Sequence, residues 1–242
     1  MSEEKTTQGT TDQPLVELKF KGSKLIANVR ENATKQELKD FIQTQYAQQS
    51  NEVYHFKKVS RPLVTKVVEN DFSNLNLDID DGSGDIFISA MQSNMYVKDG
   101  SGNLTISGAK NLTVDDGSGE VNLKNIAGNL ELTDGSGSIH INNVSGNATI
   151  EDGSGEMHVS NISGSLNVED GSGDLVISHI SGAVNVDDNS GDMIIEHIGS
   201  SVTIEDGSGD IRVNHAKGLS ITESGSGDVS IDNISGSVKV AD

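Results

Sequence analysis

Apolar residues recur with an 18-residue period from about Leu75 to the end of the chain. Each period contains the motif Asp-Gly-Ser-Gly or a close variant, and we number the positions of each coil from its first residue. The coil that begins at Asp170 has apolar residues at positions 6, 8, 15 and 17, and Ile180 adds one at position 11. Such alternation over short stretches predicts strands with one face turned inward. Each coil should therefore hold two main short strands and two tight corners.

The recurrence of the motif predicts the architecture. Its first residues are separated by 18 positions, with one step of 17. A fixed period near 20 in a glycine-rich, strand-like sequence is typical of a stacked solenoid. We predict a mainly β fold, a single-chain β-helix or solenoid of about nine 18-residue coils, forming a rod roughly 40–45 Å long. The first residues are Asp81, Asp99, Asp116, Asp134, Asp152, Asp170, Asp188, Asp206 and Ser224.

The N-terminal region has a different pattern and predicts a small α+β unit. "LVELKF" and "KLIANV" read as two strands joined by "KGS", and "VYHF" and "RPLVTKVV" as further strands. A helix is expected in "NATKQELKDFIQTQYA", where Thr34 and Glu37 have capping-box spacing. The predicted organisation is a disordered tail at 1–13, a small α+β domain or solenoid cap at 14–72, and the repeat domain at 73–242.

The negative charge lies in the repeats. Residues 1–72 carry 11 Lys and Arg against 10 Asp and Glu, whereas the remainder carries 6 against 27, which gives +1 and -21 of the net -20. Such a surface repels nucleic acid and anionic membranes and attracts cations or basic proteins. The chain has no Cys, which excludes disulfides and thiolate metal sites. With 3% aromatic residues and no Trp, a base-stacking platform is not expected.

The recurrent motif has three interpretations, and a structural corner is the favoured one. Strand alternation directs the first Asp toward the inner or corner side, where its carboxylate can accept backbone N–H bonds as an Asx turn. The glycines permit positive φ, and Asn189 replaces the first glycine in one coil, which fits a left-handed position because Asn tolerates that geometry. The predicted turn residues are Asp134, Asp152, Asp170, Asp188 and Asp206.

Calcium binding is the second interpretation. The acids before and after the turn, at positions 18 and 5, should face solvent and stack at ~4.8 Å, where neighbouring carboxylates repel by roughly 1 kcal/mol in water. Ca²⁺ prefers several oxygen ligands, but the register differs from the calcium-binding β-roll nonapeptide. A phosphate cradle is the weakest interpretation, because Gly-Ser-Gly lacks the Gly-Lys-Ser/Thr ending. The candidate metal ligands are Asp174, Asp192, Asp210, Asp228, Glu169, Asp187 and Glu205.

A polar ladder occupies position 10 of successive coils. Asn ladders stabilise stacked strands through their amides, and three His continue the ladder. A transition-metal column on these His is the alternative, and continuation of the polar ladder is favoured over it. No nucleophile with an orienting base is evident, so no catalytic site is expected. The ladder comprises Asn125, Asn143, Asn161, His179, His197, His215 and Asn233.

The repeat also resembles a known family. "GSGDLVISHISGAVNVDDNSGD" and its neighbours resemble the bacterial β-strand-repeat adhesin family, related in style to GIN-head auto-transporter adhesin domains. The resemblance covers about residues 72–242 and implies a single-chain β-helix without enzymatic activity. The stretch "LVELKFKGSKLIANVRENATKQELKDFIQTQY" is similar to the N-terminal domain of the MinC division inhibitor, which also precedes a β-helix.

Two non-enzymatic functions remain open at this stage. The first is a rigid acidic solenoid for surface display, adhesion or self-assembly, which associates through its C-terminal coil because Val238 and Val240 continue the repeat without a distinct cap. The alternative is a module that binds Ca²⁺ on its acidic columns, or a DNA mimic that binds a basic protein. No cofactor or nucleic acid is expected. Membrane insertion is not expected either, since no run approaches the ~20 apolar residues of a membrane span. A cytoplasmic location is expected if the sequence is complete, and a surface or secreted one if an export signal has been removed.

Overall fold

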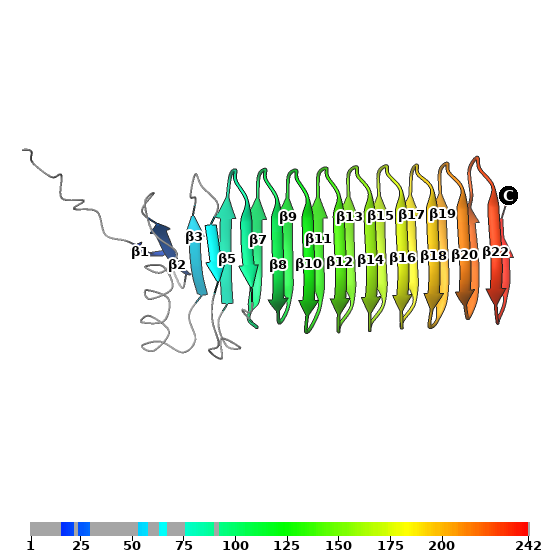
Figure 1. The fold of residues 1–242 in the computed structure, drawn as a ribbon, viewed down its shortest axis with the longest axis horizontal. Coiled ribbons are helices and arrows are strands. Elements are labelled where there is room, and N and C mark those ends of the chain that lie inside the picture. The colour runs from blue at the N-terminus through cyan, green and yellow to red at the C-terminus, as the bar shows by residue number, and fades with distance from the viewer. Residues whose placement is uncertain are drawn as a thin grey trace, which may run out of the picture.

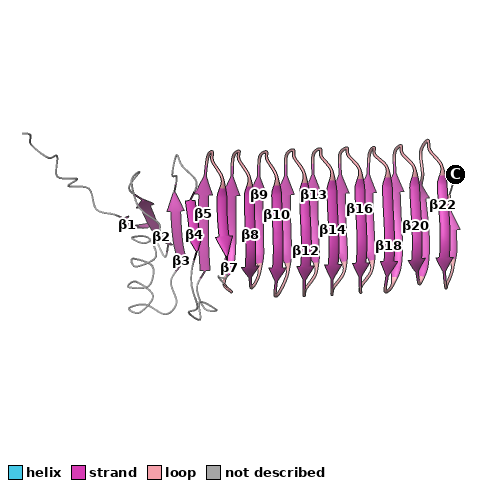
Figure 2. Ribbon diagram, in the orientation of Figure 1, coloured by secondary structure: helices cyan, strands magenta, loops and turns pink. Residues whose placement is uncertain are grey.

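The chain forms a rod of stacked coils (Figure 1). The computed structural model describes residues 16–21, 24–29, 53–57, 63–66, 76–89 and 92–241. All regular secondary structure in these ranges is β-strand (Figure 2), and none of them forms a helix long and apolar enough to span a bilayer. The predicted N-terminal tail and helix lie outside the described residues.

The strands form two sheets, one on each side of the rod. The 13-stranded sheet, here the long sheet, has the order β1-β2-β3-β5 and continues through the odd-numbered strands to β23. Its strands are β1 (Val16–Lys21), β2 (Lys24–Val29), β3 (Val53–Lys57), β5 (Asn76–Asp81), β7 (Asn94–Asp99), β9 (Leu112–Asp116), β11 (Leu130–Asp134), β13 (Ala148–Asp152), β15 (Leu166–Asp170), β17 (Val184–Asp188), β19 (Ser201–Asp206), β21 (Gly218–Glu223) and β23 (Val238–Val240).

The 10-stranded sheet, here the short sheet, runs through the even-numbered strands from β4 to β22. Its strands are β4 (Leu63–Lys66), β6 (Ile86–Ser89), β8 (Leu104–Ala109), β10 (Val121–Ile126), β12 (Ile139–Val144), β14 (Met157–Ile162), β16 (Leu175–Ile180), β18 (Met193–Ile198), β20 (Ile211–Ala216) and β22 (Val229–Ile234).

The strands of successive coils pair in parallel, position on position. Ala148 of β13 lies opposite Leu166 of β15, and Leu166 lies opposite Val184 of β17. From β3 onward, consecutive strands of the chain alternate between the sheets, so one strand from each sheet completes a coil. The predicted β-solenoid of about nine 18-residue coils is confirmed, and it spans residues 76–240.

The N-terminal strands continue the two sheets of the repeat. β1 and β2 pair antiparallel at the position of the predicted hairpin. β2 pairs with β3 and β3 with β5, both in parallel, while β4 pairs in parallel with β6. Residues 14–72 therefore contribute strands that are hydrogen-bonded to the first coils of the solenoid.

The core is a narrow apolar column between the sheets. Each regular coil contributes the five positions predicted from the sequence, 6, 8, 11, 15 and 17. In the coil that begins at Asp170 these residues are at most 4% exposed, and they are Leu175, Ile177, Ile180, Val184 and Val186. One coil buries little apolar surface by itself, so each coil depends on its neighbours for stability.

Position 11 reaches the core because the backbone bends at position 10. Every described ladder residue at that position has φ between 54° and 67°, in the left-handed region. Among non-glycine residues, Asn and His are enriched there, and the ladder consists only of these two types. The bend breaks the strict alternation of the strand, so position 11 points inward, as positions 6 and 8 do.

Substitution at this bend should separate backbone effects from side-chain effects. Asn161→Ala should lower the free energy of unfolding by about 1–2 kcal/mol, because Ala lacks the short polar side chain that makes the left-handed conformation accessible to Asn. Asn161→Gly should lose clearly less, since glycine adopts that conformation freely. Urea unfolding of both variants checks this result. Equal losses would show instead that the ladder amide, and not the backbone bend, sets the preference for Asn.

Candidate functional site

The most unusual feature of the solenoid is a buried column of aspartates. We call these residues, at position 1 of each coil, the corner aspartates. Each ends a strand of the long sheet, and neighbours such as Asp152 and Asp170 lie in parallel register. Each is at most 6% exposed, although charged groups are rarely buried unless they are paired. They are Asp81, Asp99, Asp116, Asp134, Asp152, Asp170, Asp188 and Asp206.

One oxygen of every corner carboxyl except that of Asp116 accepts a backbone N–H at the turn, whereas both oxygens of Asp116 are buried without a hydrogen-bond partner. Asp152 Oδ1 accepts the backbone N–H of Ser154 at 3.2 Å, and Asp188 Oδ1 accepts that of Ser190 at 3.0 Å. This is Asx-turn geometry. The Oδ2 atom of each corner aspartate from Asp99 to Asp206 is buried without a hydrogen-bond partner. The column therefore combines a structural acceptor with an unsatisfied buried oxygen in successive coils.

Burial changes the acidity of these carboxyls. Burial, with a smaller contribution from neighbouring corner aspartates, raises the pKa of Asp116, Asp134 and Asp152 to about 6. The pKa of Asp188 rises to about 7, mainly through burial. The backbone N–H bonds at the turn oppose these shifts, because they favour the charged form. Loss of hydration thus outweighs the hydrogen bonds.

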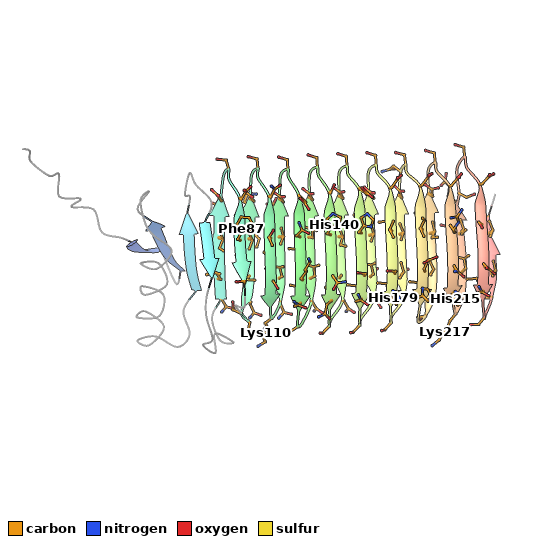
Figure 3. All side chains as sticks on the ribbon, viewed as in Figure 1. Phe87, Lys110, His140, His179, His215 and Lys217 are labelled. Atoms are coloured by element: carbon orange, nitrogen blue, oxygen red, sulfur yellow. The ribbon has the colours of Figure 1, made fainter. Side chains whose placement is uncertain are left out.

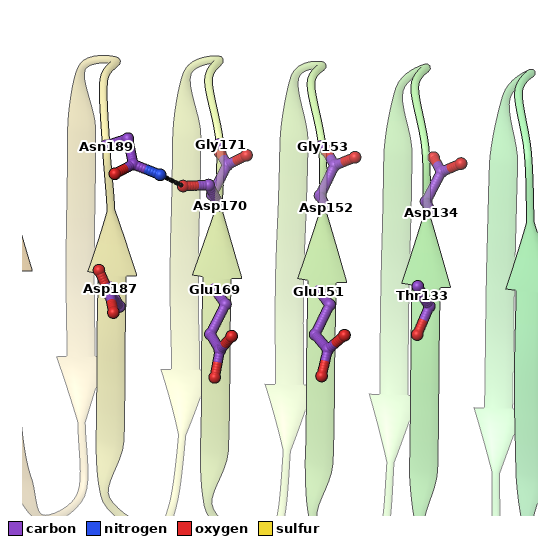
Figure 4. Close-up of a pocket in the computed structure, with 10 residues that line it drawn as sticks. All are labelled: Thr133, Asp134, Glu151, Asp152, Gly153, Glu169, Asp170, Gly171, Asp187 and Asn189. Atoms are coloured by element: carbon purple, nitrogen blue, oxygen red, sulfur yellow. Dashed lines mark hydrogen bonds between the residues drawn. The ribbon is translucent and has the colours of Figure 1, made fainter.

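The two glycines of the motif have different roles. Gly155, at position 4, has φ 153°, and a β-carbon there would overlap the carbonyl of Gly137 in the preceding coil. The position-2 glycines before Gly225 are not in the positive-φ region. Asn189, at position 2, is not there either, so its interpretation as a left-handed residue is wrong. Its amide instead donates to the backbone oxygen of Asp170 at 3.4 Å (Figure 4).

The acids at position 5 have a hydrogen-bonding role that the sequence did not reveal. Asp174 Oδ1 accepts the backbone N–H of Asp192 at 3.2 Å, and Asp192 Oδ1 accepts that of Asp210 at 3.0 Å. Asp210 Oδ1 in turn accepts the N–H of Asp228 at 2.8 Å. Asn147 does the same at the opposite corner, where it accepts the N–H of Ser165. The recurrence of Asp and Asn at fixed corner positions is the feature of the sequence that could have indicated these hydrogen bonds.

The acids at position 18 lie on the outer face of the long sheet. Glu169, Asp187 and Glu205 are exposed and in register. Glu151, Glu169 and Asp187 border an open hollow of about 430 Å³, together with the corner aspartates Asp134, Asp152 and Asp170. Figure 4 shows Glu151 and Glu169 lying farther from the turn than Asp152 and Asp170, with their carboxylates pointing away from it. The described residues contain no group of three or more His, Asp or Glu side chains arranged to hold a metal ion.

The histidines form two stacks. The ring centroids of His179 and His197 lie 4.9 Å apart and those of His197 and His215 5.1 Å apart, with the rings nearly parallel. His140 and His158 stack in the same way at 5.2 Å. Figure 3 labels His140 in this stack and His179 and His215 in the other. Face-to-face rings repeat their nitrogen atoms along the rod rather than converging them on one point. The structure thus gives these residues the geometry of a ladder.

Fold and site together define a class of protein, a two-sheet β-solenoid whose recurrent motif forms a structural corner. The chain belongs to the Toastrack DUF4097 family, whose profile matches residues 64–200, more than half of the chain. Comparisons with curated proteins and with solved structures gave no match. The family match gives no support to the adhesin, GIN-head or MinC resemblances. A repeat solenoid of this family is compatible with a non-catalytic structural or interaction module.

Proposed function

We propose that the protein is a non-enzymatic scaffold that self-associates end to end through its last coil, residues 224–241. The supporting observation is the exposure of apolar side chains there. Val238 and Val240 are 46% and 47% exposed, whereas the residues they pair with one coil earlier, Leu219 and Ile221, are 3% and 1% exposed. The inward-facing valines of the last coil are therefore apolar, as in the coils before it, but they are exposed rather than covered by apolar side chains of a following coil.

The backbone of the last coil supports the same proposal. Among the described strands, β22 and β23 lie at the ends of their sheets, and each is hydrogen-bonded to a neighbouring strand on one side only. Open strand edges are ready templates for pairing with another chain. Both edges lie at one end of the rod (Figure 1), so a partner can pair with both sheets at once.

A second copy of this chain is the partner that fits this end. Throughout the solenoid, each coil covers the next with the same apolar positions and the same strand spacing. The last coil of another copy exposes the same apolar positions, and its strands run in the opposite direction when the two copies meet end to end. Two such coils related by a two-fold axis pair their strands antiparallel, which gives a self-complementary interface. The result is a dimer with the two C-terminal coils at its centre.

Sedimentation velocity over a range of concentrations tests this proposal. The wild-type protein should sediment as a dimer at high concentration, and Val238→Lys should sediment as a monomer, because an inward-pointing charge blocks edge pairing. Ser230→Lys adds the same charge to the outward face of the same coil and should leave the dimer intact. A monomeric wild type, or equal dissociation in both variants, would rule the proposal out.

A further inference from the structure

The corner aspartates form a continuous element inside the rod, and its geometry is unsuited to negative charge. The column runs through eight coils and ends before the last one, where Ser224 stands at position 1. An ionised carboxylate needs hydrogen bonds or a cation when it is taken out of water. The unpartnered Oδ2 atoms have neither. A neutral carboxyl is more compatible with such a position, since it carries one O–H donor and no net charge.

The groups that face the column are acids. Asp188 has Asp170 and Asp206 above and below it in the column and Asp187 beside it on the same strand. Across the turn, the short-sheet strands begin after further acids, such as Asp192. Among the described cations, Lys98 is paired with Asp115 on the outer face. The charged neighbours that raise the pKa of Asp99, Asp116, Asp134, Asp152 and Asp188 are all aspartates.

We propose that the corner column is a proton-binding element, whose carboxyls take up protons as the coils stack and release them when the coils separate. The solenoid is thereby stabilised by mild acidification. Neighbouring carboxyls influence one another along the column, so protons bind to the column as a coupled set. This proposal is independent of end-to-end association, because the column lies within each chain.

The sign of the effect follows from proton linkage. An unfolded Asp has a pKa near 3.9, whereas burial and neighbouring acids raise the folded pKa of Asp116, Asp134 and Asp152 to about 6 and that of Asp188 to about 7. Between these limits the folded state binds more protons than the unfolded state. The free energy of unfolding should therefore fall as the pH rises through about 6–7. Below about pH 4 these carboxyls are protonated in both the folded and the unfolded state, so they should no longer change the free energy of unfolding with pH.

Thermal unfolding between pH 5 and pH 8 tests the proposal, at one dilute concentration so that association does not vary. The wild-type Tm should be roughly 5–15 °C higher at pH 5 than at pH 8. In the double variant Asp152→Asn/Asp170→Asn, this pH dependence should shrink by roughly a quarter, because two of eight corner carboxyls are lost. The matched control, Glu151→Gln/Glu169→Gln, removes the same charge from the adjacent outward positions and should keep the wild-type dependence.

A second readout detects the bound protons directly. Infrared spectra of the folded protein at pH 6 should show the C=O band of protonated carboxyls, weakened in the Asp→Asn variant and unchanged in the Glu→Gln control. General repulsion among surface acids would also favour low pH, but it would affect both double variants equally. Equal loss of pH dependence in the two variants, a flat or rising Tm toward pH 8, or absence of the band would overturn the proposal.

Discussion

Gly155→Ala should lower the free energy of unfolding by about 2–5 kcal/mol, among the largest effects expected from one substitution in this chain. Left-handed backbone geometry costs roughly 1–2 kcal/mol for a residue with a β-carbon, and overpacking adds about 1–3 kcal/mol. Both terms apply at Gly155, with φ 153° and the carbonyl of Gly137 where the new methyl group would lie. Relief of the overlap would strain the bond from Gly155 N–H to Ser172 O, now 2.8 Å.

Gly82→Ala is the control for this substitution. Gly82 stands at position 2 of the same motif, in the coil that begins at Asp81, and a β-carbon there would have no atom within 4 Å. Its φ is outside the positive region, so the free energy of unfolding should change by less than about 0.5 kcal/mol. Urea unfolding followed by circular dichroism measures both variants. Similar losses in the two would mean that the motif requires glycine for a reason other than the close approach of coils.

Ile177→Ala should lower the free energy of unfolding by about 2–5 kcal/mol through the loss of buried methyl groups and the cavity that remains. Ile177 is fully buried, and it lies in β16 at position 8 of its coil, within the apolar column. Two neighbouring strands of the short sheet, β14 and β18, hold the backbone of β16 in place through parallel pairing. The coil cannot collapse easily around the cavity, which favours the upper part of this range.

The neighbouring residue provides the control for the core substitution. Val176 precedes Ile177 in the same strand, points outward and is partly exposed. Val176→Ala should cost about 1 kcal/mol or less, mainly through weaker β-propensity. Thermal and urea unfolding of both variants test the assignment of inward and outward faces. A larger loss for Val176→Ala than for Ile177→Ala would contradict the register of the sheet.

The fold could be predicted from the sequence because its period directly encodes the coil. Alternation at positions such as those of Leu175 and Ile177 specifies which side chains point inward, and the 18-residue step specifies what stacks on what. Position 10 was only partly understood. The side chains of Asn161 and His179 predict a polar ladder, whereas their φ values near 60° place both residues in the left-handed region, which the sequence pattern did not predict. The interchange of Asn and His at one position carried that information.

The chemistry of the corners was less accessible. Alternation directed Asp152 toward the corner, but only the stacked structure shows that its second oxygen is sealed from water and unpartnered. The bond between Asp174 and the N–H of Asp192 joins residues 18 positions apart, and nothing in a single coil predicts it. The burial and hydrogen bonds that arise between coils could thus be identified only from the structure, whereas the strands and inward positions within one coil could be predicted from the sequence.

The most direct test of the proposed scaffold measures how two copies are arranged. The chain has no cysteine, so Ser235→Cys or Ser181→Cys introduces a single site for a spin label, and both serines are exposed. The two positions are 54 residues apart, which corresponds to three coils. Pulsed electron paramagnetic resonance then gives the distance between the labels of the two protomers.

End-to-end pairing through the last coil predicts a longer distance for the label at position 181. Three coils at ~4.8 Å in each protomer should place the Ser181→Cys labels about 20–30 Å farther apart than the Ser235→Cys labels. A shorter distance at position 181 than at position 235, or no dipolar coupling between protomers at either position, would contradict the account.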